Sequence, residues 1–348
     1  MKTKQLFYMS MIMLLIATSC QNSQKTSLTA AGATFPLPFY NMVFKSYSDT
    51  TGVQVTYGGI GSGGGIRSLK DQVVDFGATD AFLTDEQKQD LPAEIVHIPT
   101  CIGAVAIAYN LPAVDSLKLT PELLENIFMG QITKWNDPLL QSVNTGTVLP
   151  DETITVVTRS DGSGTTHIFS DYMSKVSKKW ADEVGTGNLL KWPAGISAKG
   201  NPGVAGTVSQ TTGSIGYIGS EFASALKIQV AAVQNSTGQF LKPDVKSISA
   251  AAQGDIPKDT RVMLTNSSTP DSYPISGFTW IILYKEQAYG KRSQQQALET
   301  VKLLKWLVSE EAQKEAEKVH YAPLPGDAAA KAKTILESVT YQGGKILE

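Results

Sequence analysis

The sequence is poor in the side chains that build metal sites and disulfide frameworks. It holds two cysteines and three histidines in 348 residues, and they do not stand at the spacings typical of metal ligands. Cys101 lies in an apolar run, where a lone thiol is expected to be a small buried residue. These scarcities exclude a small disulfide-stapled domain, and we expect neither a metal nor a cofactor.

Excess charge of either sign is also scarce. The formal net charge is −2, from 30 basic and 32 acidic side chains. A chain with this balance has no global positive field, so nucleic acid is not an expected partner. Hydrophobic residues make up 42% and charged residues 18%, which is ordinary for a globular protein with a sizeable core. The length suits two domains.

Long apolar runs are absent except near the N-terminus. Residues 6–17 are mostly apolar and follow Lys2 and Lys4, but the run is too short for a membrane-spanning helix. We predict a signal peptide over residues 1–19. Its end resembles a bacterial lipoprotein signal, in which Cys20 becomes the lipid-modified N-terminus and residues 20–26 form a short tether. Ala17 stands where such signals usually have Leu. The alternative is that Cys20 is an ordinary residue of a cleaved leader.

The most informative stretch is Arg-Ser-Asp-Gly-Ser-Gly-Thr-Thr at residues 159–166. An apolar β-branched run precedes it and a helical pattern follows, which predicts a strand-to-helix turn. The first amides of a helix lack intrahelical acceptors and lie at the positive end of its dipole. Arg159 adds a planar cation that matches an oxyanion's edge. The stretch is therefore typical of an anion site, with simple helix capping as the alternative.

The same strand-turn-helix arrangement recurs along the chain. Thr34 and Ser62 each stand beside a predicted helix start, and Asp80 ends an apolar strand. Residues 59–64 satisfy G-x-G-x-x-G, but no extended dinucleotide-binding core accompanies that weak pattern. A carboxylate facing an anion can only accept a hydrogen bond, so Asp80 at the site would require a protonated ligand. The alternative is a helix cap or turn residue.

Alternating strands and helices predict an α/β protein with parallel strands, whose ligands bind beyond the carboxyl ends of the strands. Residues 94–99 and 104–109 are expected to form two consecutive strands joined by a crossover between domains. Residues 278–284 predict the returning strand, and residues 295–308 and 310–319 predict amphipathic helices.

A catalytic interpretation has little support. His167 lies four residues after Ser163, but a hydrolase nucleophile elbow has the pattern Gly-x-Ser-x-Gly, which is not present here. We expect His167 to lie on a helix surface and predict that the protein is not an enzyme.

Six motifs, in order along the chain, resemble those of the periplasmic phosphate-binding proteins of bacterial ABC-type phosphate importers. They are residues 31–36 (AGATFP), 59–62 (GIGS), 74–80 (VDFGATD), 130–135 (GQITKW), 159–165 (RSDGSGT) and 213–217 (GSIGY). Together they run from residue 31 to residue 217 of the mature chain. One departure is Gly63, where the family often has a second serine.

The resemblance implies a type II periplasmic-binding fold, in which two α/β lobes are joined by a hinge and the ligand lies between them. We expect residues 27–102 and 273–348 to form one lobe and residues 103–272 the other. The implied phosphate contacts are Thr34, Phe35 through its amide, Ser62, Asp80, Arg159, Ser163, Gly164 and Thr165. Asp161 resembles the family's carboxylate that pairs with the arginine.

The implied function is binding of hydrogen phosphate outside the cytoplasmic membrane and its delivery to the permease subunits of an ABC importer. We expect a monomer, periplasmic or at the cell surface, held to a membrane by a lipid. Sulfate carries no proton near neutral pH, so it would leave the Asp80 carboxylate unpaired and bind on the order of 10³-fold more weakly. The alternatives are a receptor for a sulfate-like oxyanion and a secreted phosphoester hydrolase using Ser163.

Overall fold

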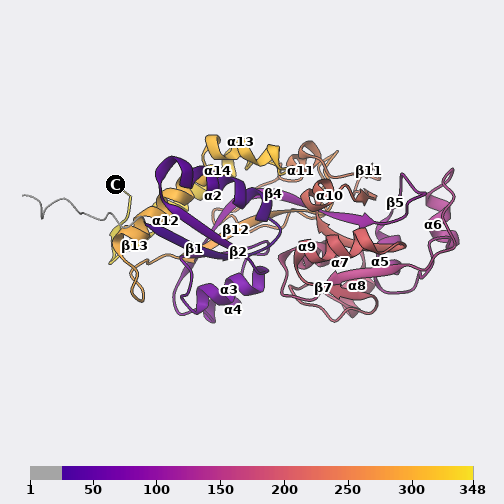
Figure 1. The fold of residues 1–348 in the computed structure, drawn as a ribbon, viewed down its shortest axis with the longest axis horizontal. Helices are drawn as coiled ribbons and strands as arrows, with labels where there is room; N and C mark the ends of the chain where they lie inside the picture. Colours follow the sequence, from indigo (N-terminus) through magenta and orange to yellow (C-terminus); the bar gives the residue numbers. More distant parts are fainter. Residues whose placement is uncertain (1–25, 348) are drawn as a thin grey trace, which may run out of the picture.

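The structure, a computed structural model, describes residues 26–347. The predicted signal peptide, Cys20 and residues 20–25 of the predicted tether lie outside the described residues. The described chain is elongated, and one half of it combines elements from both ends of the sequence while the other half holds the middle (Figure 1). None of the helices within residues 26–347 has the length and apolarity needed to cross a membrane.

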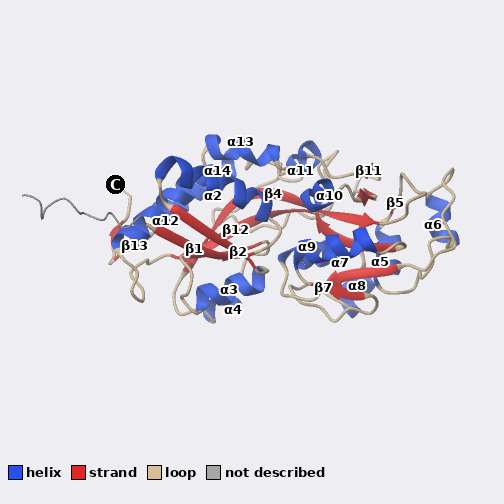
Figure 2. Ribbon diagram, in the orientation of Figure 1, coloured by secondary structure: helices blue, strands red, loops and turns tan. Residues whose placement is uncertain are grey.

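A nine-stranded sheet runs through both halves (Figure 2). Its strands pair in the order β2 (Gln54–Gly59), β1 (Ser27–Gly32), β3 (Phe76–Thr79), β12 (Ser276–Tyr284), β4 (Ile95–Tyr109), β8 (Ser214–Gly219), β6 (Thr155–Arg159) and β7 (Ile196–Ala198), with β9 (Gln229–Val230) on β4. β1 is parallel to β2 and β3, and β6 is parallel to β7 and β8. β12 and β4 are antiparallel to their neighbours. The predicted α/β class is confirmed.

Two small sheets and thirteen helices complete the described residues. The small sheets are β11 (Phe240–Leu241), β10 (Ala232–Gln234) and β5 (Lys118–Leu119), and β13 (Thr340–Tyr341) with β14 (Gly344–Lys345). The helices are α2 (Leu37–Thr51), α3 (Ser62–Lys70), α4 (Asp85–Gln89), α5 (Pro121–Phe128), α6 (Pro138–Val143), α7 (Gly164–Val176), α8 (Lys178–Glu183), α9 (Gly200–Gln210), α10 (Ser220–Leu226), α11 (Val245–Ala250), α12 (Gln294–Leu307), α13 (Glu310–Lys318) and α14 (Gly326–Glu337).

The prediction of two strands over residues 94–109 is wrong, because β4 is one strand of 15 residues. Its first part pairs with β12 and its second part with β8. Each part therefore satisfies its backbone groups with a different partner, so no turn is needed between them. Cys101 lies in this strand and is fully buried, as expected for a small apolar residue. The lobe boundaries proposed at residues 102 and 272 stay a prediction.

Several helix ends follow the local sequence. Gly52 takes a left-handed conformation after α2, and the Thr120 hydroxyl accepts a hydrogen bond from the Leu123 amide at the start of α5. α3 begins at Ser62, four residues earlier than its apolar pattern indicates. A Cβ at Gly65 would lie 2.5 Å from the Gly32 Cα. The glycines of this turn therefore let the helix backbone pack directly against β1.

Candidate functional site

The sequence-predicted site residues meet at the carboxyl ends of parallel strands. The turn after β1 carries Thr34 and Phe35, the one after β2 carries Ser62, and Asp80 follows β3. On the other half of the sheet, Arg159 is the last residue of β6, and Ser163, Gly164 and Thr165 begin α7. All eight residues are buried. Because the sheet is shared, two sets of turns that lie far apart in the sequence face one another.

Ser62 joins the two sets directly. Its Oγ accepts hydrogen bonds from the Gly164 amide at 3.0 Å and from the Asp80 amide at 3.3 Å. Beside it, the Gly63 amide donates to the Gly162 carbonyl at 3.0 Å. A Cβ at Gly164 would lie 2.5 Å from the Asp80 Cβ and 2.6 Å from the Ser62 Oγ. Only glycine permits this approach of α7 to the opposite turn.

Arg159 is held by the sheet and by Asp161. Its guanidinium is 1% exposed and donates from Nε to Asp161 Oδ1 at 2.8 Å and from Nη2 to Oδ2 at 2.6 Å. Asp161 Oδ1 also accepts from the Gly200 amide at 2.9 Å. Burial acts to raise the pKa of Asp161, but the hydrogen bonds and charge of Arg159 outweigh it and hold the pKa below its usual value. The predicted pairing of these two residues is confirmed.

Asp80 is the one carboxylate among the eight predicted residues. It is 1% exposed, and its Oδ1 accepts from the Thr279 hydroxyl at 2.7 Å. Burial raises its pKa to about 7, against the lowering effects of Thr279, Arg159 and Ser62. Near neutral pH, the Asp80 carboxyl is therefore partly protonated. It accepts a hydrogen bond when it is ionised and donates one when it is protonated.

Two of the predicted contact residues also have structural roles. Ser163 caps a helix, and the Phe35 ring packs in the core. The Ser163 Oγ accepts from the Thr166 amide at 3.1 Å, so Ser163 caps α7. Its hydroxyl hydrogen remains available to a ligand. The Phe35 ring is fully buried and meets the Tyr321 ring edge to face. Any contact of Phe35 with a ligand must therefore come from its backbone.

Asn201 is a site residue that sequence reasoning missed. It is fully buried, and its Nδ2 donates to the Thr34 Oγ1 at 3.0 Å and to the Thr165 Oγ1 at 2.9 Å. Its Oδ1 accepts from the Gly219 amide at 2.9 Å, which fixes the orientation of the side-chain amide. Residues 196–201 form a further strand-to-helix turn, from β7 into α9. This further copy of the strand-turn-helix pattern is the sequence signal that could have identified Asn201.

Four hydroxyls of the site have lone pairs engaged by protein N–H groups. Thr34 accepts from the Asn201 amide and side chain, and Thr165 accepts from Asn201 and from Arg159 Nη1 at 3.4 Å. Ser62 and Ser163 accept from backbone amides, as described above. A hydroxyl has one hydrogen and two lone pairs, so engaged lone pairs leave it to act as a donor. The arrangement therefore favours a ligand rich in acceptors.

A second buried carboxyl, Glu221, lies near the site in α10. It is 3% exposed, and neither of its oxygens has a hydrogen-bond partner among the described residues. Burial raises its pKa to about 8, with Tyr321 and Asp80 as the neighbouring titratable groups. The Tyr321 hydroxyl donates to the Phe35 carbonyl, so it can offer Glu221 only lone pairs. The protonated form of Glu221 suits this environment better than the carboxylate.

Within residues 26–347, no group of three or more His, Cys, Asp or Glu side chains could hold a metal ion. His97 is buried and accepts from the Leu83 amide at 3.1 Å, and burial lowers its pKa to about 3. His167 lies in α7 and is partly buried, and burial lowers its pKa.

The fold, with its ring of buried donors between two halves of one sheet, is that of a solute-binding protein of the periplasmic type. Residues 18–311 match the family described as PBP superfamily domain. A phosphate-binding protein PstS from Xylella fastidiosa is 38% identical over 312 residues, covering 88% of this chain and 84% of that protein. The chain therefore belongs to the PBP superfamily and, within it, to the PstS family.

Solved structures agree on the fold. A high-affinity periplasmic phosphate-binding protein bound with phosphate has a TM-score of 0.71 at 20% identity, covering 89% of this chain and 93% of that one. An ABC-type phosphate transport receptor from Vibrio cholerae has a TM-score of 0.53 at 22% identity, covering 86% and 100%. The type II periplasmic-binding fold expected from the sequence motifs is confirmed.

Proposed function

We propose that this protein binds one hydrogen phosphate ion between the two halves of the sheet and delivers it to the permease subunits of an ABC importer. The single observation that carries the proposal is the set of hydroxyls of Thr34, Ser62, Ser163 and Thr165, whose lone pairs are engaged and whose hydrogens are left for an anion. Arg159 supplies positive charge at the same place. The names of the family's members support the choice of phosphate.

In this proposal, the ligand's oxygens accept from Arg159, from the four hydroxyls and from the amides of Phe35, Gly164 and Thr165. Asp161 touches no ligand atom and holds the guanidinium in place. The Gly164 amide donates to Ser62 in the present structure, so binding would exchange that bond for one to the ligand. The protein needs few positively charged side chains to bind the ion, because neutral hydrogen-bond donors in a buried site stabilise an oxyanion strongly.

Asp80 would select for a protonated oxyanion. One proton suffices between the carboxylate and hydrogen phosphate, whereas fully deprotonated sulfate faces a buried carboxylate that has no proton to share. Arsenate has a similar shape and also carries a proton, so Asp80 would not reject it.

The lobes would close around the ion as a hinged pair, one formed by residues 27–102 and 273–348 and the other by residues 103–272. Contacts such as Ser62 with Gly164 and Thr34 with Asn201 connect these two groups of residues directly. Lipid modification of Cys20, after removal of residues 1–19, would keep a monomeric protein at a membrane, in the periplasm or at the cell surface. The protein would act there as a receptor with no catalytic step.

Calorimetric titration of phosphate-free protein tests the proposal. A ceiling of about 1.5 kcal/mol per non-hydrogen atom corresponds, for phosphate, to a low-micromolar dissociation constant. A well-organised closed site can exceed this bound, so we expect one-to-one phosphate binding at micromolar strength or tighter, with little heat from sulfate at pH 8. Arg159→Ala should weaken binding by about 100-fold or more. Arg261→Ala is the matched control, because that arginine pairs with Asp259 and Asp85 elsewhere.

A micromolar constant that survives Arg159→Ala would contradict the assigned site. Sulfate binding as strong as phosphate binding would contradict the role of Asp80. Turnover of p-nitrophenyl phosphate, lost in Ser163→Ala, would instead favour the hydrolase alternative.

A further inference from the structure

A buried carboxyl lies next to the hydrogen-bond network of the phosphate site, at the carboxyl end of β8. Glu221 is the second residue of α10, which follows β8 without a loop. A Cβ at Gly219 would clash with the Glu221 carboxyl, so only glycine leaves room for the carboxyl to fold back over the end of the strand. The Gly219 amide in turn donates to Asn201 Oδ1 at 2.9 Å. Glu221 therefore contacts the backbone that holds Asn201 in place.

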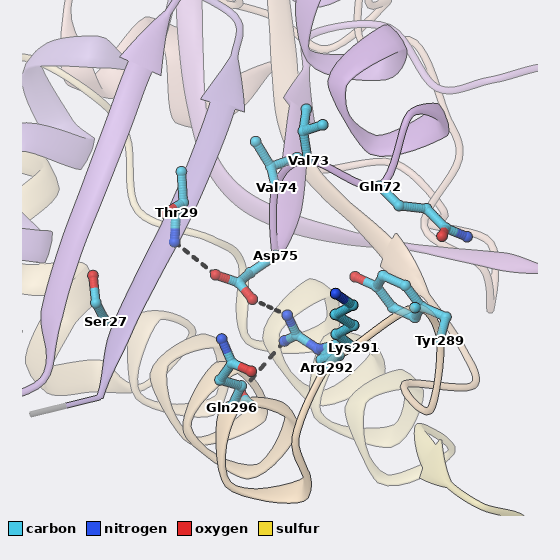
Figure 3. Close-up of a pocket in the computed structure, with 11 residues that line it drawn as sticks. Ser27, Thr29, Gln72, Val73, Val74, Asp75, Tyr289, Lys291, Arg292 and Gln296 are labelled. Carbon is cyan, nitrogen blue, oxygen red and sulfur yellow. Dashed lines mark hydrogen bonds and ion pairs between the residues drawn. The ribbon is translucent and has the colours of Figure 1, made fainter. Parts of the chain in front are cut away.

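Both oxygens of the Glu221 carboxyl are buried and have no hydrogen-bond partner within residues 26–347. The same is true of the neighbouring Ser220 Oγ. Buried carboxylates elsewhere in the described chain have partners. Asp75, for example, pairs with Arg292 and accepts from the Thr29 amide at 2.6 Å (Figure 3). A carboxylate without such partners is costly in a protein interior, so the surroundings of Glu221 favour the uncharged acid.

The titratable groups that face Glu221 in the described chain do not include a cation. They come from the segment after α13, from the residue after β3 and from β4, and they are Tyr321, Asp80 and Cys101. α9 and β8, which also pack against α10, contain no Asp, Glu, His, Lys or Arg. His320 contacts Ser224 at 3.0 Å on the exposed side of α10. A negative charge on the buried Glu221 carboxyl is therefore not balanced by these groups.

Tyr321 connects Glu221 to a predicted ligand contact. The Tyr321 ring is fully buried, and its hydroxyl donates to the Phe35 carbonyl. That hydroxyl has no hydrogen left for Glu221 and offers only lone pairs. A protonated Glu221 can donate to those lone pairs, whereas an ionised Glu221 repels them. The proton therefore stabilises the arrangement of Tyr321 and Phe35, whose amide is proposed to bind the ion.

We propose that Glu221 is a second binding site of this protein, whose ligand is a proton taken up together with phosphate. The inference rests on the proposed function, in which Glu221 belongs to one lobe and Phe35 and Tyr321 belong to the other. Separation of the lobes would open Glu221 to water, where a carboxyl ionises at its ordinary pKa of about 4.3. Closure removes that water, and the bound ion adds negative charge nearby. Both changes favour the protonated acid.

The proton comes from the surrounding buffer and returns to it. Burial alone raises the pKa of Glu221 to about 8. At pH 8, closure of the lobes would therefore draw a proton from a buffer acid and form the O–H bond of the carboxyl. Opening would reverse this step. The protein would thus carry hydrogen phosphate and a proton together, and the charge buried with the ion would be smaller by one unit.

The test is calorimetric titration with inorganic phosphate at pH 8 in buffers that differ in their heat of ionisation. The buffer dependence of the heat gives the number of protons taken up per phosphate. At this pH, Asp80 is mostly ionised and dissolved phosphate carries the one proton that the two share in the site, so they contribute little. We expect the wild-type protein to take up about half a proton or more. Glu221→Gln should bind phosphate with about no proton uptake.

Glu299→Gln is the matched control, because Glu299 is also a buried acid but pairs with Lys302 in α12. Its proton uptake should equal that of the wild-type protein. A second measurement uses the unaltered protein and does not depend on how any variant folds. Its phosphate affinity should fall by about twofold to tenfold from pH 8 to pH 9.

Phosphate binding whose heat does not depend on the buffer would overturn this inference and leave the proposed function standing. Proton uptake that is unchanged in Glu221→Gln, or a wild-type affinity that is equal at pH 8 and pH 9, would overturn it as well. Absence of phosphate binding in every buffer would contradict the proposed function itself, and with it the coupling.

Discussion

The side-chain amide of Asn201 donates a hydrogen bond to the Thr34 hydroxyl at 3.0 Å across 167 residues of sequence. The same nitrogen donates to Thr165 at 2.9 Å, so one amide sets two hydroxyls as donors from opposite sides of the site. Asn201 thus leaves both hydroxyls to act as hydrogen-bond donors toward a ligand, although the sequence motifs did not indicate this residue.

Asn201→Asp should weaken phosphate binding strongly. The new carboxylate would accept from the Thr34 and Thr165 hydroxyls, which would turn their hydrogens away from the ligand and add a repelling charge. We expect a loss of about 100-fold or more by calorimetry, roughly 2.7 kcal/mol. Asn110→Asp is the control. The Asn110 side-chain amide donates to two carbonyls at the end of α9, away from the site. Equal losses in both variants would indicate only a role in anchoring that helix.

Gly164→Ala should hinder closure of the site without unfolding the protein. The added methyl group would lie 2.5 Å from the Asp80 Cβ, so the two turns must separate. We expect phosphate affinity to fall by about tenfold or more, with the circular dichroism spectrum unchanged. In Gly206→Ala the methyl group meets open space within a helix, so that variant should bind normally and be slightly more stable. Wild-type affinity in Gly164→Ala would contradict the close approach.

Rejection of sulfate should depend on pH. The pKa of Asp80, raised by burial to about 7, means that the carboxyl is mostly protonated at pH 6 and mostly ionised at pH 8. A protonated Asp80 can donate to sulfate, whereas the ionised form cannot. Sulfate affinity should therefore rise roughly tenfold from pH 8 to pH 6. Asp80→Asn should bind sulfate equally at both values. A wild-type sulfate affinity independent of pH would contradict this role.

Glu221 should make the ligand-free protein less stable as pH rises. Burial raises its folded-state pKa from 4.5 to about 8, so the folded state binds the proton more tightly than the unfolded state. The resulting loss of stability begins near pH 4.5 and is complete above about pH 8. Glu221→Gln removes the ionisation, so urea unfolding should show a gain of a few kcal/mol at pH 9 and little change at pH 4.5.

Glu286 provides a control of opposite sign. It accepts from three backbone amides and from Thr340, which outweigh burial and lower its pKa to about 2. Its stabilising contribution is present above pH 4.5 and is lost as pH falls toward 2. Glu286→Gln should therefore destabilise the protein at pH 9. A destabilising effect of Glu221→Gln at that pH would show that its carboxylate is satisfied in the folded state.

Much of the site could be predicted because its parts are local. Each strand-to-helix turn combines an apolar run, a hydroxyl or glycine and a helix start within about ten residues. Capping and helix periodicity act over that distance. The Arg159 with Asp161 pair is also local, two residues apart. The sequence by itself therefore determined the α/β class, the turns and the anion-seeking chemistry.

Only the tertiary structure decided which turns meet and what lies between them. The continuous strand β4 depends on having β12 beside its first part and β8 beside its second. The position of Asn201, the burial of Glu221 and the pairing of Asp75 with Arg292 depend on the same sheet order. These relationships join residues far apart in the chain, and local propensity carries no information about them, because they form only when strand order and register bring distant segments together.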